Sequence, residues 1–591
     1  MKLDNKKTNL IAAILLIFVF SISLLSMKDD SLTMDELAHL PAGYSYLSQK
    51  DMRLNPEHPP LIKDLSAIPL LFIKGIKFPS QIDAWKKDVN GQWVFGNHFL
   101  FKSGNPVDKM IFWGRIPMIL VLILLGFFIF KWVKEVYGNR ASLLALFLFS
   151  FSPTFLAHGR LVTTDVGAAT AYFIATYYFL KVLKEPSKKN IIFSGISFGL
   201  AQLAKFTVII LIPFFVFVAF VWWIFKSKKF LQTLKILILV FVVGYILIWP
   251  VYLYHVWNYP LEKQISDIEA LLPGREIPIL GKMIKGLPKL TEVLIFLAKN
   301  PILRPYSYYL TGLSLVIFRG MGGHTTYFLG EVSAAGWKNF FPFSYVVKEP
   351  LVFHILTIVA LIWASLKIKE PFWKRPFKRI SDWIKNHFVE FSSLVLILIY
   401  WGFSLSTPLT LGVRHLLPVF PFTFLLIAGA INSLLKPPYL KIKYSVLAIL
   451  IFWQAISVIK IYPHFLSYFN EIVGTKNGYL YTVDSNLDWG QDLKRLKKWV
   501  EENKIDKIYI DYFGGADVEY YFGQKYMRWW GTRDEKEFEK PNYFAISASF
   551  LQGGRGLPVE GFNQPWGYYL WLNSFKPVTR IGYSIFIFYI D

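Results

Sequence analysis

The sequence predicts a polytopic α-helical membrane protein with a small α/β domain outside the membrane near its C-terminal end. Hydrophobic residues make up 54% of the 591 residues and charged residues only 18%, a balance that a single soluble globule with an ordinary polar surface does not have. About eleven apolar segments of roughly bilayer length run through the chain. After residue 461 the pattern changes to short alternating and amphipathic stretches, which are typical of a soluble domain.

The apolar segments approach the length of about 20 residues that a helix needs to cross about 30 Å of hydrocarbon. We expect the first to be a retained helix, because Asp29-Asp30 follow it in place of the small-residue cleavage site of a signal peptide. In chain order the segments are residues 10–26, 111–130, 143–156, 166–183, 191–204, 208–225, 234–254, 351–366, 392–406, 416–435 and 444–461.

Basic residues gather in alternate loops, at residues 131–134, 181–189, 226–229, 367–385 and 436–443. Since basic loops stay on the cytoplasmic side, this pattern predicts an inner N-terminus and an outer location for everything after about residue 462. These loops account for much of the net charge of +24, so we predict no nucleic-acid partner. The absence of cysteine excludes disulfides, thiolate catalysis and cysteine-based metal sites.

We predict two domains. Residues 1–461 form a transmembrane catalytic domain that includes two long outer loops, residues 27–110 and 255–349. Residues 462–591 form the α/β domain, with strands expected near 479–483, 507–513, 543–550 and 581–590. One helix there has an apolar face of Leu493, Leu496 and Val500, and we interpret Asp488 and Asp492 as carboxylates that the dipole of this helix favours.

The candidate chemistry lies at the outer membrane surface. Asp35 and Glu36 follow the first apolar segment, where a carboxylate can act as a general base. Cations at the outer ends of the segments can meet the phosphate of a lipid head group. These candidates are His58, Lys63, Arg160, Lys205, Arg414 and His415, with Asp165 beside them at the start of the fourth segment.

Simpler interpretations stand beside these. Two carboxylates at a helix start are favoured by the dipole, and Thr164-Asp165 could be only a helix cap. Lys205 and Arg414-His415 could be snorkelling side chains, and His58 before two prolines could be part of a rigid turn. Glu57-His58 could also bind a metal, but two adjacent ligands do not complete a site, so we predict no metal site.

Four motifs in order resemble one family. Asp35-Glu36, the His58 to Lys63 stretch and the Gly159 to Asp165 stretch resemble the protein O-mannosyltransferases and glycosyltransferase family 39, which are GT-C enzymes. Lys205 is similar to a lysine of the lipid A aminoarabinose transferases. The resemblance covers roughly the first 230 residues by motif order and helix position. A later motif, residues 484–493, resembles a segment of uncharacterised bacterial members.

The resemblance implies a multi-span transferase in the plasma membrane of a prokaryote, with its active site facing outward. It would move a sugar, with inversion, from a polyprenyl-phosphate donor to a hydroxyl of a protein, glycan or lipid acceptor. Asp35 or Glu36 would be the base, Asp165 would orient the acceptor or a cation, and His58, Lys63, Arg160, Lys205, Arg414 and His415 would hold the donor phosphate.

No cofactor beyond the lipid-linked donor is implied, although the glutamate matching Glu57 is associated with a metal in the aminoarabinose transferases. A transporter or flippase remains the alternative from another class, and a GT-C polysaccharide polymerase or ligase is a third reading. Few charges lie within the second to seventh segments and no inverted repeat is visible, which favours the enzyme over the transporter.

Overall fold

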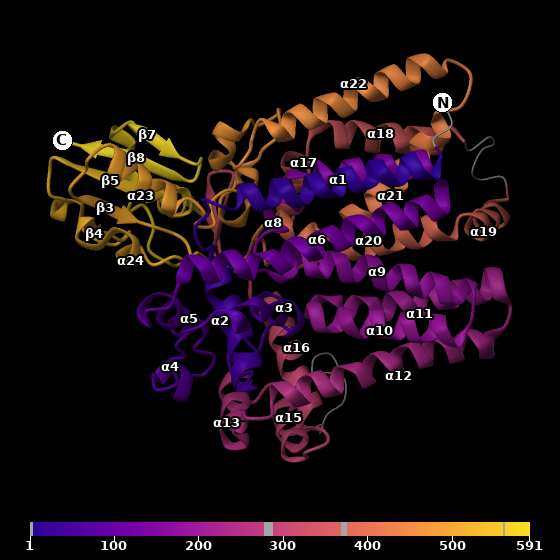
Figure 1. Cartoon of the computed structure of the whole chain (residues 1–591), viewed down its shortest axis with the longest axis horizontal. Coiled ribbons are helices and arrows are strands. Elements are labelled where there is room, and N and C mark those ends of the chain that lie inside the picture. The colour runs from indigo at the N-terminus through magenta and orange to yellow at the C-terminus, as the bar shows by residue number, and fades with distance from the viewer. Residues whose placement is uncertain (1–3, 277–287, 368–374, 560–561) are drawn as a thin grey trace. The chain divides into compact units, whose positions relative to one another are not determined.

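The computed structural model describes residues 4–276, 288–367, 375–559 and 562–591, and most of them are helical (Figure 1). By internal contacts the chain divides into two units. The first comprises Met1–Met34, Ile119–Leu161 and Gly322–Asp591, and the second comprises Asp35–Met118 and Val162–Met321. The predicted domain boundary at residues 461 and 462 stays a prediction.

Within the described ranges, seven helices are long and apolar enough to cross a membrane, or eight if one bent pair counts as a single span. This confirms a polytopic helical membrane protein, with fewer full-length spans than the eleven expected. The seven are α1 (Asn5–Ser26), α6 (Val107–Tyr137), α9 (Thr164–Lys184), the stretch Phe206–Ser227 that contains α11 (Leu211–Trp222), α12 (Phe230–His255), α20 (Phe388–Ser406) and α22 (Leu440–Ile459).

The other four expected segments are shorter helices, namely α7 (Asn139–Ser150), α10 (Lys188–Ala204), α18 (Leu351–Leu366) and α21 (Phe420–Leu434). The segment 143–156 is divided because Ser152 caps a new helix, α8 (Pro153–His158), with Pro153 in its first turn. The bent pair joins α18 to α17 (Phe340–Lys348) at an angle of 108°. Local capping chemistry therefore shortens spans that the apolar pattern alone extends.

The second unit contains most of the loop between α1 and α6 together with a helical group. The loop contains α2 (Met34–Gln49), α3 (Leu61–Ala67), α4 (Asp83–Lys86) and α5 (Gln92–Asn97), and the later part of the unit adds α13 (Leu261–Leu271), α15 (Leu290–Lys299) and α16 (Arg304–Gly322). Helices α9 to α12 run alongside one another (Figure 1). A Cβ on Gly199 of α10 would lie only 2.7 Å from the Gly244 carbonyl oxygen of α12, so glycine permits this close packing.

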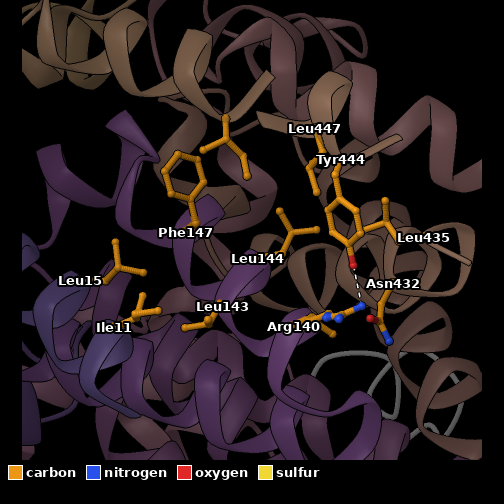
Figure 2. A pocket seen from close by; sticks show the side chains of 12 residues that line it. Ile11, Leu15, Arg140, Leu143, Leu144, Phe147, Asn432, Leu435, Tyr444 and Leu447 are labelled. Atoms are coloured by element: carbon orange, nitrogen blue, oxygen red, sulfur yellow. Dashed lines mark hydrogen bonds between the residues drawn. The ribbon is translucent and has the colours of Figure 1, made fainter. Parts of the chain in front are cut away.

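In the first unit, α1, α7, α21 and α22 surround a cavity of about 570 Å³ (Figure 2). Its lining is aliphatic and aromatic apart from Arg140, Asn432 and Tyr444, and the Arg140 guanidinium donates a 2.6 Å hydrogen bond to the Tyr444 hydroxyl. No carboxylate lines this cavity, so it is not a candidate for general-base chemistry. The basic stretch at residues 367–385 contains most of α19 (Pro376–Asn386), and its residues 368–374 lie outside the described ranges.

The C-terminal part of the first unit contains the expected α/β structure. A five-stranded sheet has the order β4-β3-β5-β8-β7, in which β3 lies parallel to β4 and β5, while β8 is antiparallel to β5 and β7. Its elements are α23 (Leu493–Glu502), β3 (Ile508–Asp511), α24 (Val518–Phe522), β4 (Tyr526–Arg528), β5 (Asn542–Ser547), α25 (Ala548–Arg555), β7 (Thr579–Ile581) and β8 (Ile585–Ile590).

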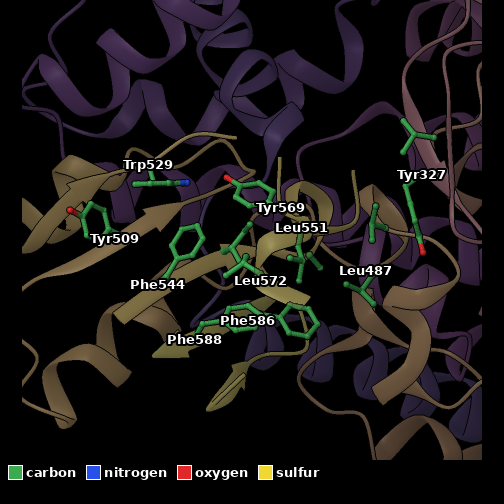
Figure 3. Close-up of a cluster of buried hydrophobic side chains, with 14 of the residues drawn as sticks. Tyr327, Leu487, Tyr509, Trp529, Phe544, Leu551, Tyr569, Leu572, Phe586 and Phe588 are labelled. Atoms are coloured by element: carbon green, nitrogen blue, oxygen red, sulfur yellow. The ribbon is translucent and has the colours of Figure 1, made fainter. Parts of the chain in front are cut away.

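Aromatic side chains form the core of this α/β part. Figure 3 shows Phe544, Phe586 and Phe588 beside Leu572 and Tyr569, all of them buried. The strands expected near 507–513, 543–550 and 581–590 are present, and Leu493, Leu496 and Val500 face the core from α23. The prediction of a strand at residues 479–483 is wrong, because the chain forms a 3₁₀ helix at Thr475–Leu480. A second, three-stranded sheet pairs β1 (Thr326–Phe328), β2 (Glu331–Ser333) and β6 (Leu557–Pro558).

Candidate active site

Helix α2 carries both predicted base candidates, and the structure gives them different surroundings. The Glu36 carboxylate is fully buried and pairs with the Arg115 guanidinium through two contacts, 2.9 Å from Nε to Oε1 and 2.6 Å from Nη2 to Oε2. The Val162 backbone N–H also donates to Glu36 Oε1 at 2.9 Å. A carboxylate held by a bidentate arginine and a backbone donor is a poor proton acceptor, so the geometry favours Asp35, which is partly exposed.

His39 lies on the same face of α2 as Asp35, because the two residues are four positions apart. Its Nδ1 lies 3.0 Å from the Val162 carbonyl oxygen, and its ring meets the His58 ring edge-on at 5.0 Å between centroids. Burial lowers the pKa of His39, and the nearby Asp35 carboxylate opposes that shift. The sequence analysis did not select His39, although its helical spacing from Asp35 was a usable signal.

Asp165 and Lys205 form an ion pair in the second unit, with 2.5 Å between Lys205 Nζ and Asp165 Oδ1. Asp165 lies in the first turn of α9 and its side chain is 1% exposed. Lys205 follows the last residue of α10 in an extended backbone conformation, and its side chain is 13% exposed. Asp165 therefore has a specific cationic partner in addition to its place at a helix start, and Lys205 is buried more deeply than a snorkelling residue.

The ammonium of Lys63 is surrounded by acceptors. It lies 2.8 Å from the Tyr46 hydroxyl, 2.8 Å from Asn55 Oδ1, 3.0 Å from the Asn55 carbonyl oxygen and 2.8 Å from the His58 carbonyl oxygen. An ammonium has three protons, so these partners use its whole donor capacity. Burial lowers the pKa of Lys63 to about 7. This arrangement favours a role for Lys63 in shaping the loop at residues 55–58.

His58 faces several cations. Burial lowers its pKa well below the ordinary value, and the neighbouring His39, Lys63, Lys205 and Arg319 lower it further. A neutral imidazole next to cations can donate to or accept from a ligand oxygen, and the surrounding positive charge favours an anion there. Arg319, at the end of α16, has a side chain that is 51% exposed, and the sequence analysis did not select it.

Glu57 is held by two amides. The Asn90 and Gln92 side chains donate to its two carboxylate oxygens at 3.0 Å and 2.7 Å, and Arg319 Nη1 lies 3.7 Å from its Oε1. In the ranges that the structure describes, no three His, Asp or Glu side chains gather closely enough to hold a metal ion. Glu57 therefore links the loop to the exposed guanidinium of Arg319.

Three further predicted cations lie in the first unit. Arg160 is buried and pairs with Asp30, with 2.8 Å between Nη2 and Oδ2. The Arg414 guanidinium lies 4.2 Å from the centroid of the Trp489 ring, and its Nε donates to Ser485 Oγ at 3.1 Å. The His415 carbonyl oxygen accepts a hydrogen bond of 2.7 Å from Tyr400. The contacts of Arg414 join it to residues 485–489. The roles of the three cations toward a donor stay predictions.

Comparison with known proteins places one segment in a family. Residues 107–254 match the family model described as dolichyl-phosphate-mannose-protein mannosyltransferase, and this segment contains Arg115, Arg160, Asp165 and Lys205. No curated protein matches the chain.

Three solved structures show weaker similarity. The oligosaccharyltransferase of Archaeoglobus fulgidus, in complex with zinc and sulfate, is 14% identical with a TM-score of 0.41, and the match covers 88% of this chain and 62% of that one. ArnT from Cupriavidus metallidurans is 11% identical with a TM-score of 0.31, covering 98% and 97%. The Pmt1-Pmt2 O-mannosyltransferase complex of S. cerevisiae, bound to the sugar donor, is 15% identical with a TM-score of 0.31, covering 49% and 38%.

With TM-scores below 0.5, these structural similarities add no argument of their own. The family match alone covers the helices that carry the Asp165–Lys205 pair and the arginine partner of Glu36. The match confirms the predicted resemblance to the mannosyltransferases over residues 107–254.

Proposed function

We propose that this membrane protein transfers a sugar from a polyprenyl-phosphate donor to an acceptor hydroxyl on the outer face of a prokaryotic plasma membrane, with inversion. The observation that carries the proposal is the grouping of charges in the second unit. The rings of His39 and His58 are in edge-on contact, with 5.0 Å between their centroids. His39 also interacts electrostatically with Asp35 and Asp165, and His58 with Lys205, the partner of Asp165. A partly exposed carboxylate near neutral histidines and cations suits the transfer of a group from an anionic leaving group.

The proposed step needs one base and one anion site. A carboxylate oxygen of Asp35 takes the proton of the acceptor hydroxyl, and the hydroxyl oxygen of the acceptor attacks the anomeric carbon at the same time. The bond from the anomeric carbon to the phosphate oxygen breaks, and its electron pair leaves with polyprenyl phosphate. Lys205, His58 and Arg319 stabilise the charge that develops on the departing phosphate. The proton on Asp35 is then lost to water.

The Lys205 side chain is the first test of the anion site. Lys205→Ala is expected to weaken binding of free polyprenyl phosphate by about 10-fold, because a charge-assisted contact to an anion contributes about 1.5–3 kcal/mol. The measurement is titration of the purified protein with undecaprenyl phosphate at low and moderate salt. The loss should be larger at low ionic strength, where cations act over longer distances.

Lys263 supplies a matched control, because it pairs with Asp267 at 2.6 Å and its side chain is 15% exposed, close to the values for Lys205. Lys263→Ala should leave binding unchanged. An absence of binding by the unmodified protein would count against the transferase proposal. Equal losses in both lysine variants would count only against Lys205 as the phosphate ligand.

The outward orientation can be tested with single introduced cysteines, because the sequence contains no native cysteine that would react with the label. A cysteine at exposed Lys576 in the α/β part should react with a membrane-impermeant maleimide on intact cells, whereas one at exposed Lys188 should react only after lysis. Lys188 belongs to one of the basic loops that the charge pattern keeps inside. If the cysteine at position 188 is labelled on intact cells and the one at position 576 is not, the topology is the opposite of the one proposed.

A further inference from the structure

Residues 488–495, which precede and begin α23, carry a second set of buried charges in the first unit. Asp492 and Asp30 have side chains that are 0% and 1% exposed, and both pair with Arg495, at 2.5 Å and 2.8 Å. Asp30 also pairs with Arg160 at 2.8 Å. These four side chains form a neutral chain of alternating charges that links the C-terminal part to the residues after α1.

The backbone makes the same link. The Ser31 N–H donates to the Gln491 carbonyl oxygen at 2.8 Å, and the Met34 N–H donates to the Trp489 carbonyl oxygen at 3.1 Å. In return, the Lys494 N–H donates to Ser31 Oγ at 2.7 Å. Residues 30–33 are in neither a helix nor a strand, so these bonds supply the partners that regular structure would otherwise give to a buried backbone.

Residues 488–495 are themselves anchored. Ser549 of α25 donates to the Asp488 carboxylate through its backbone N–H at 2.9 Å and to the Asp488 carbonyl oxygen through its hydroxyl at 3.1 Å. Leu487, directly before them, belongs to the aromatic core of the α/β part (Figure 3). Gly490 has φ of +92°, and a Cβ there would lie 2.4 Å from the Gly514 Cα, so the turn requires glycine.

The next residue after Met34 in the chain is Asp35, the proposed base. We propose that residues 488–495 position Asp35 for catalysis by fixing residues 30–34, so that the C-terminal part is a component of the catalytic machinery. This inference rests on the proposed function. It gives a role to the 484–493 motif, which the transferase chemistry alone does not use.

The free-energy cost of burying these four charges favours a role in positioning Asp35 over a role in stabilising the fold. Burying four charged side chains costs desolvation free energy, and well-packed apolar residues would often stabilise the same place as well or better. A network of paired charges instead admits one arrangement, because a displaced member leaves a buried charge without its partner. A general base must be held within a fraction of an ångström of its acceptor, and misplacement by about 1 Å can cost about 10²-fold in rate. Fixing residues 30–34 restricts the backbone that directly precedes Asp35.

The first experiment uses hydrogen–deuterium exchange on the full-length protein in detergent. Arg495→Met should increase the exchange rate of peptides covering residues 30–40 by about 10-fold, because the Asp30 and Asp492 carboxylates lose their shared guanidinium. Arg495→Lys keeps the charge but cannot bridge two carboxylates in the same planar geometry, so it should restore part of the protection. Arg533→Met is the control, since Arg533 pairs with Glu537 at 2.8 Å within the α/β part.

The second experiment asks whether the effect passes through Asp35. With polyprenyl-phosphate mannose as the donor probe, Arg495→Met should lower turnover by about 10-fold while the donor KM stays unchanged. In an Asp35→Asn background the Arg495→Met change should have no further effect, since a positioning residue acts only when the group it positions is present.

The outcomes separate the two proposals. Unchanged exchange of residues 30–40 in folded Arg495→Met protein would overturn the positioning inference, and so would additive losses in the double variant. If Asp35→Asn keeps full turnover, the base assignment of the proposed function fails. If no turnover is seen with the mannose probe, the exchange result still decides whether residues 488–495 hold the segment that leads into Asp35.

Discussion

Replacement of Asp35 by asparagine is expected to lower turnover by about 10²-fold or more while donor binding stays nearly intact. The amide keeps the size of the carboxylate and removes its ability to take a proton, and loss of a general base costs about 10²–10⁴-fold. An interaction made only in the transition state changes kcat and leaves binding of the ground state alone. The measurement is single-turnover release of polyprenyl phosphate, combined with titration of the product lipid.

Asp83 provides the matched control for the interpretation that Asp35 only caps a helix. It begins α4 in the same loop between α1 and α6, and its side chain is 66% exposed and 3.1 Å from Lys87. Asp83→Asn removes a carboxylate from a helix start without touching the grouped charges, so turnover should not change. Full activity of Asp35→Asn with a donor that the unmodified protein uses would contradict the base assignment.

The second large effect is on stability and concerns Glu36. Glu36→Gln is expected to destabilise the protein by about 3–5 kcal/mol, because it leaves the Arg115 guanidinium, which is 1% exposed, without its charged partner. Removing one member of a buried ion pair leaves the other charge buried without a compensating partner in surroundings of low polarity. Thermal unfolding in detergent, followed by tryptophan fluorescence, measures the change.

A double variant distinguishes a structural pair from a catalytic residue. Glu36→Gln combined with Arg115→Met removes both charges, so its unfolding temperature should lie above that of either single variant. If Glu36 were the base in place of Asp35, Glu36→Gln would unfold normally and still be inactive. Normal stability of the single variant would therefore return Glu36 to the list of base candidates.

Sequence reasoning selected the candidate residues and could not rank them. Asp35 and Glu36 are adjacent and have the same local propensity, so no pattern along the chain separates them. The difference lies in Arg115 and Val162, which are 79 and 126 positions away from Glu36. For the same reason the sequence does not distinguish Lys63 from Lys205. In the structure, acceptors such as Tyr46 and Asn55 use the N–H donors of Lys63, whereas Lys205 pairs with the Asp165 carboxylate.

The helical spans show a similar limit. Each apolar segment that the sequence predicted lies on helical structure, because burial in hydrocarbon depends on composition averaged over about 20 residues. It overestimated the number of full spans where a single residue interrupts a predicted segment, as Ser152 does. A window of hydropathy does not detect one cap.

By itself, the sequence determined that this is a membrane protein of many helices and that its C-terminal part is α/β. Those properties follow from composition, periodicity and local motif order, which are local quantities. Only the tertiary structure decided that Glu36 is buried against Arg115, that acceptors surround the Lys63 ammonium, and that Asp488 to Arg495 contact the residues before Asp35. Each of those depends on contacts between residues far apart in the chain, and pairing in a buried site is fixed by packing that no local pattern encodes.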